Sequence, residues 1–262
     1  MHSINLSGHI LNNYNTDINI IGSIPDYELI YKAIELFSTK NDELEQLIVT
    51  DNQFDFRTEK SRKRFLSAVY SAFLNFNSDT HKELLIQLFN TNLSLQSKQM
   101  ILFWQFSFTN QLFYEITKNV FIKSYFSGRV SLPKDDVVAF IKEIILQTPE
   151  LKDLWSEITI NTIASKYLTM LKKLNLVDGT SKKTFKHIQL SNEELLIFIY
   201  FIKTLEPENT NVLKSKYIDF SFVSQDSFLN KVKQLAKKEL FEMSYNGEQL
   251  KIELNQTYRG IN

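Results

Sequence analysis

The sequence predicts a mainly α-helical protein, made of helical bundles with helix-turn-helix or winged-helix-like units and ending in a short β-hairpin. Of its 262 residues, 43% are apolar and 13% aromatic, enough to bury one large core or two smaller ones. Only 6 glycines and 4 prolines are present, which favours long helices with brief connections over a β-sandwich. Apolar residues also recur at helical spacing along much of the chain.

The N-terminal half is expected to contain a flexible lead-in, residues 1–23, and a helical domain, residues 24–130. The lead-in is polar and rich in asparagine. Pro25 is tolerated in the first turn of a helix, and Thr58 is a cap for the third helix of the domain. Three short helices with a basic turn before the last have the size of a helix-turn-helix unit, although such units also occur in proteins that never bind DNA.

Aromatic residues crowd the helical middle section, from residue 79 to about 127. These rings lie in a run that is hydrophobic on most sides: Phe89, Phe103, Trp104, Phe106, Phe108, Phe113, Tyr114, Phe121, Tyr125 and Phe126. Such rings stack on bases in some proteins, but a run of this kind normally forms the core around which other helices pack. We therefore expect these rings to be buried.

Residues 131–206 predict a winged-helix-like domain. Thr159 is a plausible N-cap for an amphipathic helix, whose apolar face is formed by Ile160, Ile163, Ala164, Tyr167, Leu168, Leu171 and Leu174. Asp178 and Gly179 then predict a turn, and the alternating residues 182–190 predict a strand of the wing. The alternative is an ordinary helix whose polar face meets water, which is the more common case for an isolated helix.

Residues 207–262 are expected to form a C-terminal module of one helix and one β-hairpin. A linker around Pro207 separates the module from a helix whose start is marked by Ser191 and Glu194. Asn246 and Gly247 lie between two alternating segments, which predicts a hairpin with a two-residue turn.

The formal net charge is zero, but the charges are segregated along the chain. Residues 24–55 hold eight acidic residues against two lysines, whereas residues 57–64 hold five cations against Glu59. Residues 166–186 hold six lysines against Asp178. Cations contact phosphates, and the short polar groups of the helix contact base edges, so the candidate DNA-binding residues are Arg57, Lys60, Arg62, Lys63, Arg64, Asn161, Thr162, Ser165, Lys166, Lys172, Lys173, Lys182, Lys183 and Lys186.

The motifs of common enzymes are missing from the sequence. It has no glycine-rich phosphate loop, no metalloprotease histidine pair and no Gly-x-Ser-x-Gly elbow, so no catalytic residue, metal ligand or cofactor is expected. The absence of cysteine excludes disulfides and fits a reducing cytoplasm. The longest uncharged run, residues 99–114, is shorter than the roughly 20 apolar residues of a spanning helix, so no membrane association is expected.

Several segments together resemble the BrxA family, the small all-helical component of BREX bacteriophage-defence systems. The similarity covers about residues 20–205 and rests on the basic segment 57–65, the aromatic middle section, the segment 154–157, and Thr162, Leu168, Leu171, Leu176 and Val177. The resemblance implies a non-enzymatic DNA-binding protein that works beside a methyltransferase, an ATPase and a phosphatase-like protein.

The leading hypothesis is therefore a cytoplasmic accessory protein that binds double-stranded DNA and other BREX proteins. Two alternatives stay open. A protein-interaction scaffold would use the same segregated charges to bind separate partners. An RNA-binding helical protein would use exposed aromatic rings and would prefer single strands.

Overall fold

The computed structural model describes residues 14–40, 43–254 and 258, and it divides into two compact units. Unit 1 combines residues 1–30, 45–75 and 105–187, and unit 2 combines residues 31–44, 76–104 and 188–262. Each unit therefore contains three separate stretches of the chain. The four consecutive segments expected from the sequence stay a prediction.

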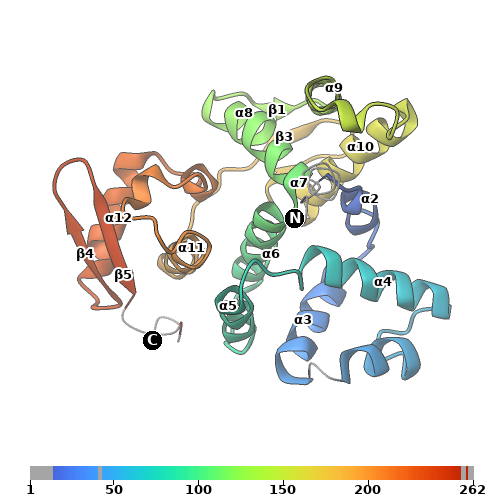
Figure 1. The fold of residues 1–262 in the computed structure, drawn as a ribbon, viewed down its shortest axis with the longest axis horizontal. Helices are drawn as coiled ribbons and strands as arrows, with labels where there is room; N and C mark the ends of the chain where they lie inside the picture. The colour runs from blue at the N-terminus through green and yellow to red at the C-terminus, as the bar shows by residue number, and fades with distance from the viewer. Residues whose placement is uncertain (1–13, 41–42, 255–257, 259–262) are drawn as a thin grey trace, which may run out of the picture. The chain divides into compact units, whose positions relative to one another are not determined.

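The prediction of a mainly α-helical fold with a terminal hairpin is confirmed (Figure 1). Two helices, α3 (Glu28–Lys40) and α6 (Leu95–Thr109), contribute residues to both units. The other elements of unit 1 are α2 (Asp17–Ile21), η2 (Gln46–Thr50), α4 (Glu59–Ala72), α7 (Gln111–Ile116), η3 (Thr117–Ile122), α8 (Lys123–Phe126), β1 (Ser131–Leu132), α9 (Lys134–Gln147), η4 (Pro149–Leu151), α10 (Glu157–Lys173), β2 (Val177–Asp178) and β3 (Lys183–Phe185).

The three short strands of unit 1 form an antiparallel sheet in the order β1-β3-β2. Ser131 pairs with Thr184 at one edge of β3, and Asp178 pairs with Thr184 at the other edge. The predicted turn after Asp178 is present, and Gly179 has a φ of +94°, a backbone conformation that L-residues with a side chain rarely adopt. Helices α9 and α10 lie in the chain between β1 and β2 and pack against each other.

The core of unit 1 is a chain of aromatic contacts. The ring centroids of Phe106 and Phe113 are 4.8 Å apart, and those of Phe113 and Tyr167 are 5.2 Å apart. The hydroxyl of Tyr167 lies 3.1 Å from Thr117 Oγ1, so its polar end has a partner inside the core. Burial raises the pKa of Tyr167 far above its usual value. These contacts confirm that the aromatic middle section supplies core residues.

Unit 2 contains, besides parts of α3 and α6, the elements α5 (Asp79–Phe89), α11 (Asn192–Leu205), η5 (Val212–Lys214), η6 (Ile218–Ser221), α12 (Gln225–Ala236), β4 (Phe241–Tyr245) and β5 (Leu250–Leu254). Trp104 is fully buried, and its Nε1 donates to the Phe220 carbonyl at 3.0 Å. The predicted start of α11 is confirmed, because Ser191 and Glu194 form a reciprocal capping box.

Three details differ from the expectations. Residues 17–21, expected within the flexible lead-in, form α2 and bury Ile18 and Ile21; residues 1–13 lie outside the described part. Helix α3 begins at Glu28, whose N–H bonds to Asp26 Oδ1, rather than at Pro25. The two-residue turn of the C-terminal hairpin lies one residue later than predicted: Tyr245 pairs with Leu250 and the Asn246 N–H bonds to the Gln249 carbonyl at 3.3 Å, which leaves Gly247 and Glu248 in the turn.

Candidate nucleic-acid interface

Helix α10 carries the central predicted surface, and its start differs from the prediction. Ser156, not Thr159, is the N-cap, since its hydroxyl accepts a hydrogen bond from the Thr159 N–H at 3.2 Å. The two residues are both good caps, and their hydroxyls are 3.1 Å apart. The predicted apolar face is buried as expected, with Ile163, Ala164 and Tyr167 at 0% exposure.

The polar face of α10 presents short side chains that are hydrogen-bonded to their own helix. Asn161 Nδ2 donates to the Glu157 carbonyl at 2.9 Å, Thr162 Oγ1 to the Ile158 carbonyl at 2.7 Å, and Ser165 Oγ to the Asn161 carbonyl at 2.8 Å. These residues line one open hollow together with Ile158, Lys134 at the start of α9, and Glu157, whose carboxylate pairs with Lys142 at 2.8 Å. Bonds of this kind hold the side chains in one rotamer and keep the face smooth.

Two lysines of the same helix lie next to the segment after α2, Lys166 through its Cβ and Lys173 through its ammonium. Gly22 lies so close to Lys166 that a Cβ at this position would be 2.7 Å from the Lys166 Cβ. Lys173 Nζ donates to the carbonyls of Gly22, at 3.3 Å, and Ile24, and it lies 5.2 Å from the centre of the Tyr27 ring. Burial and the nearby Lys166 lower the pKa of Lys173. The ammonium of Lys173 therefore serves an internal contact.

The lysines after Lys166 have different environments, and with Lys166 we call them the α10 cluster: Lys166, Lys172, Lys173, Lys182, Lys183 and Lys186. Lys183 Nζ donates to the carbonyls of Gly179 at 2.9 Å and Thr180 at 2.5 Å. Burial and the nearby charge of Lys172 lower the pKa of Lys183.

Lys186 Nζ is held between Asp178 and the side chain of Asn175. Lys172 and Lys182 are exposed, and among the described residues neither ammonium takes part in an ion pair or a hydrogen bond. These two cations of the α10 cluster are the ones directed to solvent without a partner in the described chain.

The second group of cations, the α4 cluster, consists of Arg57, Lys60, Arg62, Lys63 and Arg64. The predicted cap Thr58 is confirmed, since its hydroxyl accepts from the Ser61 N–H at 3.1 Å. Arg62 Nη1 donates to the Val49 carbonyl at 2.6 Å, which ties α4 to η2. Lys63 pairs with Glu59 at 2.6 Å, and this contact lowers the pKa of Glu59 and raises that of Lys63.

Arg57, Lys60 and Arg64 of the α4 cluster are exposed and form no ion pair within the described residues. Helix α2 packs against both α10 and α4, and Figure 1 places α4 and the small sheet on different sides of α2. Unit 1 therefore carries the two clusters on different elements, and whether they contact one DNA duplex stays a prediction.

Two residues of the α10 surface were not predicted from the sequence. Lys134 follows Pro133, a helix-start signal, but only the packing of α9 on α10 brings it to the hollow. Ile158 is 80% exposed although it is a large aliphatic residue. The signal that would have found Ile158 is its spacing of three and four residues from Asn161 and Thr162 on one helix face.

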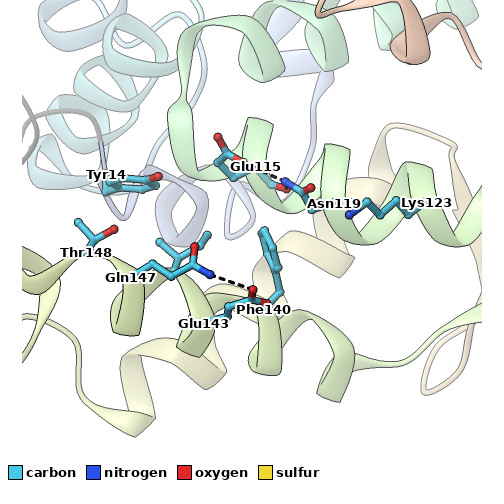
Figure 2. A pocket seen from close by; sticks show the side chains of 9 residues that line it. Tyr14, Glu115, Asn119, Lys123, Phe140, Glu143, Gln147 and Thr148 are labelled. Carbon is cyan, nitrogen blue, oxygen red and sulfur yellow. Dashed lines mark hydrogen bonds between the residues drawn. The ribbon is translucent and has the colours of Figure 1, made fainter.

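A second hollow of unit 1 has a different chemistry (Figure 2). Helix α9 and the segment α7–η3 line it with two carboxylates, those of Glu115 and Glu143. Asn119 Nδ2 donates to Glu115 at 2.9 Å, and Gln147 Nε2 donates to Glu143 at 3.0 Å. Within the described residues neither of these carboxylates forms an ion pair, whereas Glu157 beside the α10 face is paired with Lys142. Unpaired carboxylates repel phosphate, so this hollow is not part of the candidate interface.

The described residues also bear on base stacking, metal binding and membrane insertion. The aromatic rings considered for base stacking are mostly internal, with Phe103, Trp104, Phe106, Phe113 and Phe121 at 0% exposure, but Phe126, which was expected to be buried, is 47% exposed. No group of three or more histidine, aspartate or glutamate residues suited to a metal ion occurs in the described part. Among the helices that the structure describes, none has both the length and the apolar character needed to cross a membrane.

The fold and the surface define a mainly α-helical protein in which a polar helix, flanked by cations, stands beside a small three-stranded sheet. The family model described as BrxA matches residues 27–198, and the chain belongs to the BrxA family. Membership supports an association with BREX phage defence. The match extends from the segment before α3 into α11, so α12 and the C-terminal hairpin lie beyond it. No curated protein matches the chain significantly.

Proposed function

We propose that this protein is an accessory component of BREX defence that binds duplex DNA in the cytoplasm without cleaving or modifying it. The observation that carries the proposal is the open face of α10, flanked by Lys134, Lys172 and Lys182. Among the described residues, none of these three ammonium groups is paired with a carboxylate. Unpaired cations beside a smooth polar helix face supply the phosphate contacts that dominate DNA affinity.

The order of elements supports this proposal. Helix-turn-helix proteins place the second helix of a packed pair in the major groove, and α9 and α10 are such a pair. The antiparallel strands β2 and β3 follow α10 directly, in the position of a wing that contacts the backbone beside the groove. In this arrangement α10 faces base edges while Lys172 and Lys182 contact phosphates.

Duplex DNA is favoured over RNA for two reasons. The major groove of B-form DNA admits a helix, whereas that of A-form RNA is too narrow for side chains to read. Recognition of single strands depends on exposed aromatic rings, and most rings of this chain that were considered for stacking are buried.

The test is fluorescence anisotropy of the full chain with a labelled duplex of mixed sequence, in a salt series that begins at low ionic strength. We expect binding at micromolar protein or below and an affinity that falls linearly with the logarithm of salt concentration. Single-stranded RNA of equal length should compete poorly. Absence of duplex retention at low salt, or stronger competition by RNA, would overturn the proposal.

A protein-interaction scaffold is the second candidate, and one observation favours it. Leu146 of α9 and Leu154 before α10 are 84% and 57% exposed, although apolar side chains of this size are normally covered. A scaffold would keep its BREX partners after nuclease treatment. Loss of all partners on nuclease treatment, combined with duplex binding by the isolated chain, would favour DNA binding over this candidate.

A further inference from the structure

We propose that the exposed face of α10 distinguishes A·T from G·C base pairs in the major groove, with Ile158 against the thymine methyl group and Asn161 against adenine. This inference rests on the proposed function and names the sequence class that the same surface prefers.

Ile158 supplies the first argument. Its side chain stands 80% exposed in the first turn of α10, where an aliphatic group gains nothing from water. It lines the open hollow with Lys134, Asn161 and Thr162, so apolar and polar groups share one surface. The C5 methyl of thymine is the apolar group that the major groove offers, and Ile158 is complementary to it.

The hydroxyl groups of α10 supply the second argument. Thr162, Ser165 and Thr169 donate their protons to helix carbonyls at 2.7, 2.8 and 2.8 Å. Toward a ligand their oxygens therefore offer lone pairs and no proton. Guanine presents only acceptors, N7 and O6, in the major groove, so this face has little to offer it. Adenine N6 and cytosine N4 are the amino donors that these lone pairs accept, so the hydroxyl groups disfavour guanine, and the choice between the two base pairs depends on Ile158 and Asn161.

Asn161 supplies the third argument. One of its two Nδ2 protons is donated to the Glu157 carbonyl at 2.9 Å, which orients the amide. One proton and the Oδ1 acceptor are then left over. That pair matches N7 and N6 of adenine, the usual bidentate contact of an asparagine.

Helix α10 itself supplies no guanine reader beside Asn161. Helix α10 contains no arginine, and its lysines 166 and 173 lie against the segment after α2. Lys172 is exposed, but it stands roughly 16 Å along the helix axis from Asn161, so it reaches the backbone rather than the same base pairs. Lys134, which lines the hollow from α9, is assigned to a phosphate in the proposed function, so the apolar contact of Ile158 and the amide of Asn161 decide the preference and favour A·T pairs.

The experiment compares four duplexes of equal length at one salt concentration: A·T-rich, G·C-rich, A·U-rich with deoxyuridine in place of thymidine, and I·C-rich with deoxyinosine in place of deoxyguanosine. We expect the A·T duplex to bind roughly five- to twentyfold more tightly than the G·C duplex. Deoxyuridine should remove part of this preference, because it lacks only the methyl group. The I·C duplex should bind like G·C, since deoxyinosine keeps the major-groove acceptors of guanine.

A matched pair of variants assigns the effect to one side chain. Ile158→Ala should abolish the difference between the A·T and A·U duplexes and leave G·C binding unchanged. Leu146→Ala, which truncates an equally exposed aliphatic residue on α9, should preserve that difference. Both sites are exposed, so folding is expected to survive in each variant.

The outcomes separate the two proposals. Equal binding of all four duplexes overturns this inference and leaves the proposed function standing. Binding of I·C as tight as that of A·T overturns it as well, because the minor groove would then be the surface read. Failure of every duplex to bind overturns the proposed function itself.

Discussion

The two basic clusters of unit 1 differ in the backbone groups that surround their cations. Much of the α10 cluster lies near the end of a helix and in the following turn, where backbone carbonyls lack helical partners and attract ammonium groups. Lys173 is bonded to the carbonyls of Gly22 and Ile24 at the end of α2, and Lys183 is bonded to carbonyls of the turn between β2 and β3. The α4 cluster lies at the beginning of a helix, where the dipole disfavours cations. Within the described residues only Arg62 and Lys63 of this cluster have a bonding partner, the Val49 carbonyl and the Glu59 carboxylate.

This difference shows that a count of positive charges does not measure a phosphate-binding surface. A lysine close to free carbonyls is already hydrogen-bonded within the protein. A cation at the start of a helix is instead repelled by the positive end of the helix dipole. Lys172 and Lys182 in the α10 cluster, and Arg57, Lys60 and Arg64 in the α4 cluster, are the charges without an internal explanation. The following changes test that division, beginning with the largest expected effect.

The double variant Lys172→Glu with Lys182→Glu should weaken duplex binding by roughly a hundredfold, since each lost phosphate contact costs about tenfold in affinity near physiological salt. Anisotropy titration at fixed salt measures the loss. The matched control is Lys186→Gln, because the ammonium of Lys186 is held by Asp178 and Asn175. Unchanged affinity in the double variant would remove the α10 cluster from the interface.

The neighbours Arg62 and Arg64 should separate stability from binding. Arg62→Ala leaves the Val49 carbonyl without its guanidinium partner and should lower the free energy of unfolding in urea by about 1–3 kcal/mol. Arg64→Ala should leave unfolding unchanged but reduce the salt slope of DNA binding by about 1. The comparison fails if the two variants behave alike in both measurements.

Lys173→Met should alter the dependence of stability on pH. In the folded protein the pKa of Lys173 is below the value of about 10.4 that it has in the unfolded chain. Between these two pKa values the unfolded chain binds the proton and the folded protein does not, so wild-type stability rises with pH across that window. Urea unfolding of both proteins in alkaline buffers measures the rise, which the variant should lack. Parallel curves would mean that burial of this ammonium has no energetic consequence.

The smallest effect is expected for Glu59→Gln. This change releases Lys63 from its ion pair and removes a negative charge from the α4 cluster, so duplex affinity should increase roughly two- to fivefold. Glu253→Gln breaks a comparable exposed pair with Lys251 in unit 2 and is the control. Unchanged affinity would place the α4 cluster outside the DNA contact.

Local signals in the sequence were sufficient for much of the fold. The caps Thr58 and Ser191 were predictable because the bonds they make lie within four residues. The start of α10 was missed since Ser156 and Thr159 are equally good caps three residues apart. The hairpin turn was predicted one residue too early, because Asn246 bonds to Gln249 across the hairpin and its Oδ1 accepts from the N–H groups of Glu248 and Gln249, which places Asn246 before the turn and not within it.

The candidate site was less predictable, because the groups that bind some of its cations lie far from them in the sequence. The carbonyls of Gly22 and Ile24 lie about 150 positions from Lys173 and give no sign of that contact in the sequence. Lys134 reaches the α10 surface only through helix packing. The short polar residues Asn161, Thr162 and Ser165 were found because their helical spacing alone places them together.

The interleaved course of the chain limits how the protein can be dissected. Because α3 and α6 each supply residues to both units, no single cut yields one unit complete and the other absent. A fragment of residues 1–187, for example, would keep Phe37, Leu84 and Trp104 but lack the remainder of their own core. Assignments of activity to a half of the molecule therefore need point substitutions in the intact polypeptide, and expression of truncated fragments is expected to give aggregation rather than autonomous domains.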